Sequence, residues 1–215
     1  IDILKFMTNL HNQAQKKGGS VYSLLGNHEI MNTTGDLRYV SDANLKKDGG
    51  EERRRLLFTP GNEIANFLAC TRKMILKIGK SIFVHGGLIP ELVEEKYKGN
   101  KGIKKINEIV SKYLLGMKDN NQNYSELLFK NSAPIWDRTY PKSNEEECVR
   151  NLKKIDKFYK VGRMIVGHTP QENGINIRCD NKLHLVDVGA SRSFKNLNKK
   201  EVLLIENDNQ VKILR

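Results

Sequence analysis

Three short apolar segments with the composition of β-strands each end in a cluster of glycine and histidine. They are SLLGNHE at residues 23–29, IFVHGG at 82–87 and MIVGHTP at 164–170. In layered α/β proteins, ligands bind beyond the ends of the strands, so clusters that lie far apart in the sequence can meet at one site. We therefore expect a layered α/β protein with a single site at these three strand ends.

Hydrophobic spacing along the rest of the chain predicts helices that alternate with strands early and strands that dominate late. Helices are expected over residues 3–17, over 60–70 with Pro60 in the first turn, and around 148–159. Residues 32–55 have the pattern of a long loop or a broken helix. Further strands are predicted at residues 21–25, 74–78, 81–84, 163–166, 175–178, 183–188, 202–206 and 211–214, with Gly79 and Lys80 forming a hairpin turn.

This order of elements favours an α/β class, with a layered β-sandwich flanked by helices. The 215 residues suit one domain over residues 1–215 better than two small ones. Residues 88–131 are mostly helical in pattern, with a polar connection at 119–123, and are interpreted as a helical insertion within that domain.

The formal net charge of +12 predicts a surface that attracts anions, which include nucleic acid, anionic lipid and phosphorylated substrates. The basic residues form short scattered clusters without interleaved aromatic residues, and this favours a generally basic surface over a nucleic-acid groove. No apolar run approaches the roughly 20 residues that span a bilayer, so we expect a soluble segment. The compartment stays open, because a targeting signal would lie upstream of Ile1.

The three cysteines, Cys70, Cys148 and Cys179, are far apart in the sequence and contain no C-x-x-C pair. They indicate neither a zinc knuckle nor a disulfide framework, and they weakly favour a reducing compartment. An odd number of cysteines still permits one disulfide with one free thiol.

Asn27, His85 and His168 stand in the three strand-end clusters and offer one amide oxygen and two imidazoles. These groups bind borderline divalent metals such as zinc, manganese and iron. A single histidine at a strand end is more often a hydrogen-bonded or surface residue, but three clusters of the same kind favour a metal site. His11 and His184 lack this context and are expected to be structural.

The ordered set GNHE, VHGGL and VGHTP resembles the phosphoprotein phosphatase branch of the calcineurin-like metallophosphoesterases. The strings GNHEIMNTTGDLRYVS, PIWDR and HLVDVGAS are most similar to the Shewanella-like protein phosphatases, and the similarity covers nearly the whole chain. The resemblance implies a metallophosphoesterase fold. It also implies hydrolysis of phosphomonoesters on a phosphorylated protein or peptide by attack of a metal-bound hydroxide.

By this resemblance, Asn27, His85 and His168 ligate one metal of a dinuclear pair, and His28 is the general acid that protonates the leaving group. Arg138 in PIWDR corresponds to the family's phosphate-binding arginine. The alternative for Arg138 is a surface ion pair with a nearby carboxylate.

Four further residues are candidates for supporting roles. Glu29 is expected to orient a neighbour through hydrogen bonds. Arg38 and Tyr39 are placed at the substrate entrance, although a loop anchored by a salt bridge explains them equally well. Asp187 ends a predicted strand and is either structural or part of the site.

The family's metal site also contains the motifs GD-x-HG and GD-xx-DRG, and neither string occurs in this sequence. The resemblance implies two divalent ions (Mn, Fe or Zn) in the complete domain, but at most one, weakly bound, in this chain, together with little catalysis. We interpret the chain as lacking the N-terminal strands that carry these motifs, since it starts in the middle of a helical pattern. The alternative is a natural protein that has lost half of its metal site.

Two other functions remain open at this point. A dinucleoside polyphosphate hydrolase would use the same scaffold and a basic cleft. A catalytically impaired module that binds phosphoproteins or nucleic acid would need no complete metal pair.

Overall fold

A five-stranded mixed sheet forms the centre of the protein in a computed structural model that describes residues 1–118, 123–191, 193–194 and 200–215. The order of the strands is β1-β2-β3-β5-β4. β2 pairs in parallel with β3, and β3 pairs in parallel with β5, while the outer strands β1 and β4 are antiparallel to their neighbours. The strands are β1 (Ile75–Ile78), β2 (Ser81–Val84), β3 (Arg163–Val166), β4 (Asn176–Arg178) and β5 (Leu183–Leu185).

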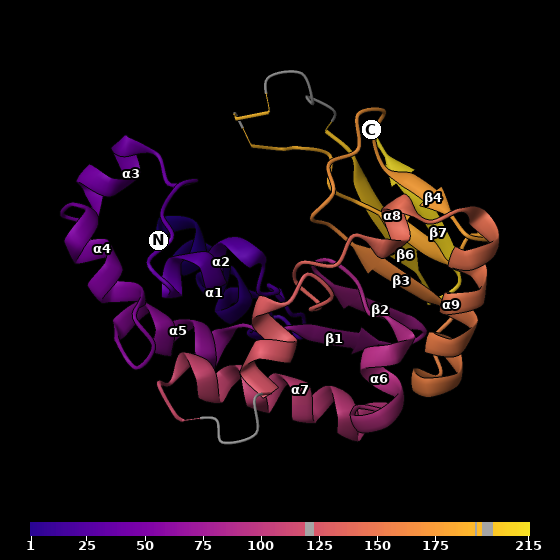
Figure 1. Cartoon of the computed structure of the whole chain (residues 1–215). Coiled ribbons are helices and arrows are strands. Elements are labelled where there is room, and N and C mark those ends of the chain that lie inside the picture. Colours follow the sequence, from indigo (N-terminus) through magenta and orange to yellow (C-terminus); the bar gives the residue numbers. More distant parts are fainter. Residues whose placement is uncertain (119–122, 192, 195–199) are drawn as a thin grey trace.

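A separate two-stranded sheet consists of β6 (Val202–Glu206) and β7 (Gln210–Leu214). Its turn is attached to the central sheet by Asp208. The Asp208 carboxylate accepts hydrogen bonds from the Lys80 amide, and its backbone carbonyl accepts one of 2.8 Å from the Arg163 guanidinium. Figure 1 shows this hairpin near β3 and β4, with helices α1 to α5 gathered at the other end of the molecule.

Helices such as α5, α7 and α9 pack against the sheet or against each other. α7 buries Ile103, Ile106, Val110 and Leu114 at helical spacing and lies against β1 and α5. None of the helices in the described ranges is long and apolar enough to cross a membrane. The helices are α1 (Asp2–Gln15), α2 (Asn27–Thr33), α3 (Asp42–Lys47), α4 (Glu51–Phe58), α5 (Glu63–Thr71), α6 (Pro90–Lys96), α7 (Gly99–Leu114), α8 (Thr139–Lys142) and α9 (Glu145–Tyr159), with a π-helix η1 (Ser125–Phe129).

The expected α/β class, with a sheet flanked by helices, is confirmed, and so is the hairpin of β1 and β2. Residues 32–55 are a broken helical region that contains α3 and α4. The helical character of residues 88–131 appears as α6, α7 and η1, whereas their status as an insertion stays a prediction. Of the predicted connection at 119–123, residues 119–122 lie outside the described residues.

Three local predictions were wrong. Residues 21–25 form no strand, because their pairing is limited to a single parallel bridge between Leu24 and Lys73. Pro60 is not in a first turn, since Gly61 has a left-handed backbone (φ 91°) and α5 begins only at Glu63. The strand predicted at 183–188 ends at Leu185.

The cysteine pattern also needs a correction, because Cys148 and Cys179 form a disulfide and Cys70 is free and exposed. Both bonded cysteines are fully buried. The disulfide joins α9 to the residue that follows β4 and closes a separation of 31 residues in the sequence. The alternative of one disulfide plus one free thiol is therefore the arrangement that the structure contains.

His184 lies in the middle of β5 and is 1% exposed, with its backbone paired to Ile165 on one side and Ile177 on the other. Its Nδ1 has no hydrogen-bond partner within the described residues. Burial, with a smaller effect from the Arg163 guanidinium, lowers the pKa of His184 from 6.5 to about 4. The imidazole is therefore neutral in the folded protein at pH values where an exposed histidine is protonated.

We predict that His184→Gln makes the stability of the protein less sensitive to acid. A group with a lowered pKa in the folded state contributes stability above its unfolded pKa and loses it as the pH falls, here from 6.5 towards about 4. In that window the free energy of unfolding of the unaltered chain should fall more steeply than that of His184→Gln, by up to about 1.4 kcal/mol per pH unit. Urea unfolding followed by circular dichroism at several pH values measures both slopes, and equal slopes would contradict the prediction.

Candidate functional site

The parallel pairing of β2 with β3 brings His85 and His168 together. Val84 lies opposite Val166 at the carboxyl ends of the two strands, and the Gly167 amide donates a hydrogen bond of 2.9 Å to the His85 carbonyl. The two imidazole rings have their centroids 5.0 Å apart. Two of the three predicted metal donors therefore meet at one edge of the sheet.

The third predicted donor, Asn27, is the first residue of α2. Its Oδ1 lies 2.8 Å from Nε2 of His85, at hydrogen-bonding distance. Glu29 holds this helix start, because its Oε2 accepts a hydrogen bond of 2.8 Å from the Gly26 amide. A Cβ atom on Gly26 would lie 3.1 Å from the His85 ring, so glycine permits the close approach of the two segments.

His28 follows Asn27 but is exposed towards solvent. Its ring stacks on Tyr39 with a centroid distance of 5.0 Å and an interplanar angle of 7°. The loop that carries Tyr39 is braced by Arg38, which forms an ion pair of 2.7 Å with Asp36. Arg38 therefore forms a salt bridge within this loop, as the alternative given for it expects. The loop forms one wall of the site.

Arg138 stands on the opposite wall, in the segment that the sequence contains as PIWDR. This segment is fastened to the end of β2, since the Gly86 and Gly87 amides donate to the Pro134 carbonyl at 2.7 and 3.1 Å. Nη1 of Arg138 donates a hydrogen bond of 3.3 Å to Oγ1 of Thr169. Among the described residues, Arg138 forms no ion pair with a carboxylate.

All nine residues predicted for the site line one cavity of about 1650 Å³, whereas His11 and His184 do not. Asp187, which follows β5, is held by two main-chain amides: its carboxylate accepts from the Gly189 amide and its carbonyl accepts from the Gln171 amide. The cavity-lining residues from the prediction are Asn27, His28, Glu29, Arg38, Tyr39, His85, Arg138, His168 and Asp187.

Burial keeps His85 and His168 neutral. It lowers the pKa of His85 from 6.5 to about 3, and the neighbouring His168, His28 and Arg138 act in the same direction. Burial and Arg138 lower the pKa of His168 to about 4. Neutral imidazoles retain the lone pair that a metal needs, so the donors Asn27, His85 and His168 fit a divalent cation.

The Glu29 carboxylate also lines the cavity, and its pKa is shifted in the opposite direction from those of His85 and His168. Burial raises the pKa of Glu29, and its hydrogen bond from Gly26 opposes that effect. Within the described residues, no group of three His, Cys, Asp or Glu side chains is placed to hold a metal ion. A cation at this edge of the sheet would therefore depend on the amide oxygen of Asn27 as well as on the two imidazoles.

Three contacts of the site were not predicted. The Trp136 ring meets the His168 ring edge to face at 6.0 Å. Asp137, 2% exposed, accepts hydrogen bonds from the Thr139 amide and hydroxyl. Thr169 binds Arg138. The contacts of Trp136 and Thr169 join distant segments, whereas that of Asp137 is local. Only the position of these residues beside the recognised motifs could have pointed to them.

Comparisons with known proteins agree with this geometry. The family model of calcineurin-like phosphoesterases matches residues 2–172. An uncharacterized protein of Acanthamoeba polyphaga mimivirus is 36% identical over 93% of this chain and 92% of its own length. The Shewanella-like protein phosphatase 2 of Arabidopsis thaliana is 28% identical over 100% of this chain, which spans 64% of that relative.

A solved structure is also similar. The crystal structure of the cold-active protein-tyrosine phosphatase of a psychrophile Shewanella species matches 100% of this chain and 64% of its own with a TM-score of 0.75 and 28% identity. The resemblance to the Shewanella-like phosphatases is therefore confirmed. The chain belongs to the calcineurin-like phosphoesterase family.

Proposed function

We propose that the protein is a metal-dependent phosphoprotein phosphatase that hydrolyses phosphomonoesters. The observation that carries this proposal is the meeting of Asn27, His85 and His168 in one cavity with His28 and Arg138 on its walls. Family membership supports it, and so do the names of the relatives, which include a Shewanella-like protein phosphatase and a protein-tyrosine phosphatase.

Asn27, His85 and His168 would hold one divalent cation, with manganese, iron and zinc as the candidates. Oδ1 of Asn27 and Nε2 of His85, 2.8 Å apart, are close enough to share one small ion. When bound, the metal supplies a Lewis acid that polarises the phosphoryl group and lowers the pKa of water. These donors are positioned by α2 and by the ends of β2 and β3.

The other residues act on the phosphate ester. Arg138 binds phosphoryl oxygens with its planar guanidinium, which can hold two oxygens as charge shifts in the transition state. His28 donates a proton to the departing oxygen of the ester. Its stacking on Tyr39 fixes the plane of the imidazole, and its exposure on the rim of the cavity leaves it within reach of a bound substrate.

A phosphorylated protein or peptide is the proposed substrate. The cavity is broad, and its lining includes the cations Arg38, Arg138 and Lys142, which suit a phosphorylated segment of chain. A dinucleoside polyphosphate would meet the same charges and is the alternative substrate. The choice among phosphoserine, phosphothreonine and phosphotyrosine is to be measured.

We predict that residues 1–215 bind at most one Mn²⁺ ion, and that Asn27→Ala or His85→Ala weakens this binding at least tenfold, because each removes one of three donors. Equilibrium dialysis against Mn²⁺ gives the number of ions and the affinity. His11→Ala is the matched control, since His11 lies on α1 outside the cavity and binds the main chain of Val21. Equal binding by the unaltered chain and the two site variants would exclude this metal site.

We predict that the complete natural protein hydrolyses phosphopeptides with Mn²⁺ and that EDTA abolishes this turnover. His28→Ala should lower kcat on a phosphoserine peptide by about 10²- to 10⁴-fold, since the serine alkoxide needs a proton to leave. The loss should be smaller on p-nitrophenyl phosphate, whose leaving group is a weak base. Steady-state kinetics on both substrates, with His11→Ala as control, measure the difference.

Three results would count against this function. They are turnover that does not depend on a metal, unchanged kinetics in His28→Ala, and faster hydrolysis of a dinucleoside polyphosphate than of any phosphopeptide. The last result would favour the alternative hydrolase. Phosphopeptide binding without any hydrolysis would favour a binding module instead.

A further inference from the structure

The segment that carries Arg138 is too short to hold its own conformation. Arg138 is the N-cap residue of α8, a helix of four residues. An isolated turn of this length is unstable, because fixing its backbone costs more than its one or two internal hydrogen bonds return. At the start of α8, Oδ1 of Asp137 accepts from the Thr139 amide at 3.2 Å and from the Thr139 hydroxyl at 2.6 Å.

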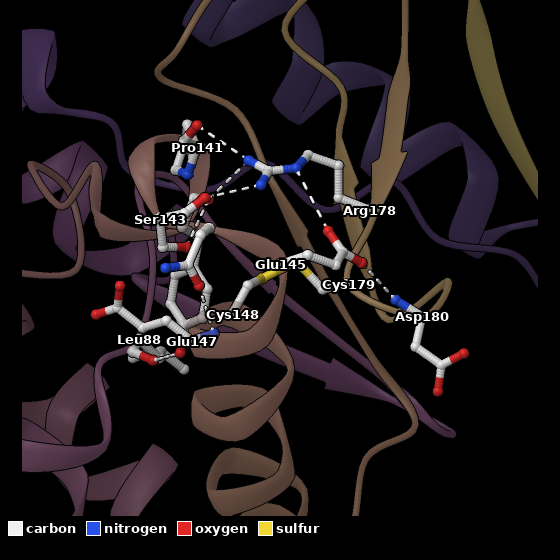
Figure 2. The surroundings of a disulfide bond; sticks show 11 residues. Leu88, Pro141, Ser143, Glu145, Glu147, Cys148, Arg178, Cys179 and Asp180 are labelled. Atoms are coloured by element: carbon white, nitrogen blue, oxygen red, sulfur yellow. Dashed lines mark hydrogen bonds and ion pairs between the residues drawn. A yellow bond between two sulfur atoms is a disulfide. The ribbon is translucent and has the colours of Figure 1, made fainter.

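The end of α8 is held by Arg178, the last residue of β4. Nη1 of Arg178 donates to the carbonyls of Tyr140 and Pro141 at 3.2 and 3.0 Å, and Nη2 donates to the carbonyl of Ser143 at 2.8 Å. Carbonyls at the end of a helix have no partner within the helix, so a guanidinium fork there satisfies several of them at once. Figure 2 shows Arg178 reaching from β4 to this turn.

Arg178 is itself fixed by its neighbours. Cys179 is bonded to Cys148 in α9, and Glu145 at the start of α9 accepts from the Asp180 amide at 3.1 Å (Figure 2). Oε2 of Glu145 also lies 3.9 Å from Nε of Arg178. These bonds matter because β4 is a three-residue strand at the end of the strand order, where it pairs with β5, and is followed by a left-handed backbone at Cys179, with φ 58°.

The Arg138 side chain has few contacts of its own that fix its direction. Within the described part of the chain its guanidinium makes one hydrogen bond, to Thr169, and no ion pair. The direction of its side chain therefore depends on the backbone of α8. Lys142, at the other end of α8, is exposed and lines the same cavity, so the same backbone places a second cation at its rim.

We propose that Arg178 is a positioning residue that directs Arg138 at the phosphoryl group, and that the Cys148–Cys179 disulfide keeps Arg178 in place. This inference rests on the proposed function, since it assigns Arg178 to the phosphate-binding wall of that site. Arg178 does not line the cavity and acts only through the backbone of α8.

A double-mutant cycle in the complete natural protein tests this. Arg178→Met removes the guanidinium fork and keeps the aliphatic stem. It should raise the KM for phosphopeptide and weaken inhibition by inorganic phosphate, with a loss of about ten- to a hundredfold in kcat/KM, since small displacements of a positioned group cost this much. In the Arg138→Ala background, Arg178→Met should cause almost no further loss, because its effect passes through Arg138.

Two variants separate positioning from a general loss of stability. Arg163→Met removes another arginine that donates to a main-chain carbonyl, at the end of β3 remote from His168, and should leave phosphate inhibition unchanged. Arg178→Lys keeps the charge without the fork. It should therefore fold even if Arg178→Met does not, and it should give an intermediate loss in kcat/KM. Replacing Cys148 and Cys179 with serine should shift phosphate inhibition in the same direction as Arg178→Met.

The outcomes distinguish this inference from the function on which it rests. If Arg138→Ala weakens phosphate inhibition but both Arg178 variants leave it unchanged, or if Arg178→Met and Arg138→Ala combine additively, the positioning role is overturned and the phosphatase stands. If Arg138→Ala itself leaves phosphate inhibition and turnover unchanged, the proposed site fails together with this inference.

Discussion

The pairing of β2 with β3 is the interaction on which the site depends. With Val84 opposite Val166, the two strands end at the same level, and the Gly167 amide binds the His85 carbonyl. A slip of one residue would turn alternate side chains to the other face of the sheet. Such a slip would take apolar side chains such as Ile82 and Met164, which are fully buried, out of their present packing, so core packing maintains the register that holds the two imidazoles together.

Much of this arrangement could be predicted, because the relevant signals are local. The apolar runs that became β2 and β3 and the motifs that follow them lie within a few residues of each other. The segment before Asn27 misled the prediction, because composition indicates that a segment can be extended but not whether a partner pairs along its whole length. Around Leu24, the pairing is limited to a single bridge with Lys73.

The rest could not be predicted, because it consists of contacts between distant segments. The cysteine spacing left a disulfide open without choosing a pair, and the pairing depends on α9 and the end of β4 lying side by side, with 5.7 Å between the Cα atoms of Cys148 and Cys179. The stacking of His28 on Tyr39 and the contact of Trp136 with His168 arise in the same way. Residue types at strand ends indicate which groups gather, whereas their partners follow from the tertiary packing.

The two walls of the cavity are stabilised by different means. The histidines stand at the ends of buried, hydrogen-bonded strands, so displacing them requires disruption of the central sheet. Arg138 stands at the start of a single helical turn. Besides the Pro134 carbonyl that binds Gly86 and Gly87 and the buried Tyr140 side chain, this turn is held by the Asp137 carboxylate and by the Arg178 guanidinium with a disulfide behind it. Local openings cost less free energy than global unfolding where few buried contacts are lost. Changes to a few of these side chains can therefore displace Arg138 while His85 and His168 stay where the paired strands place them.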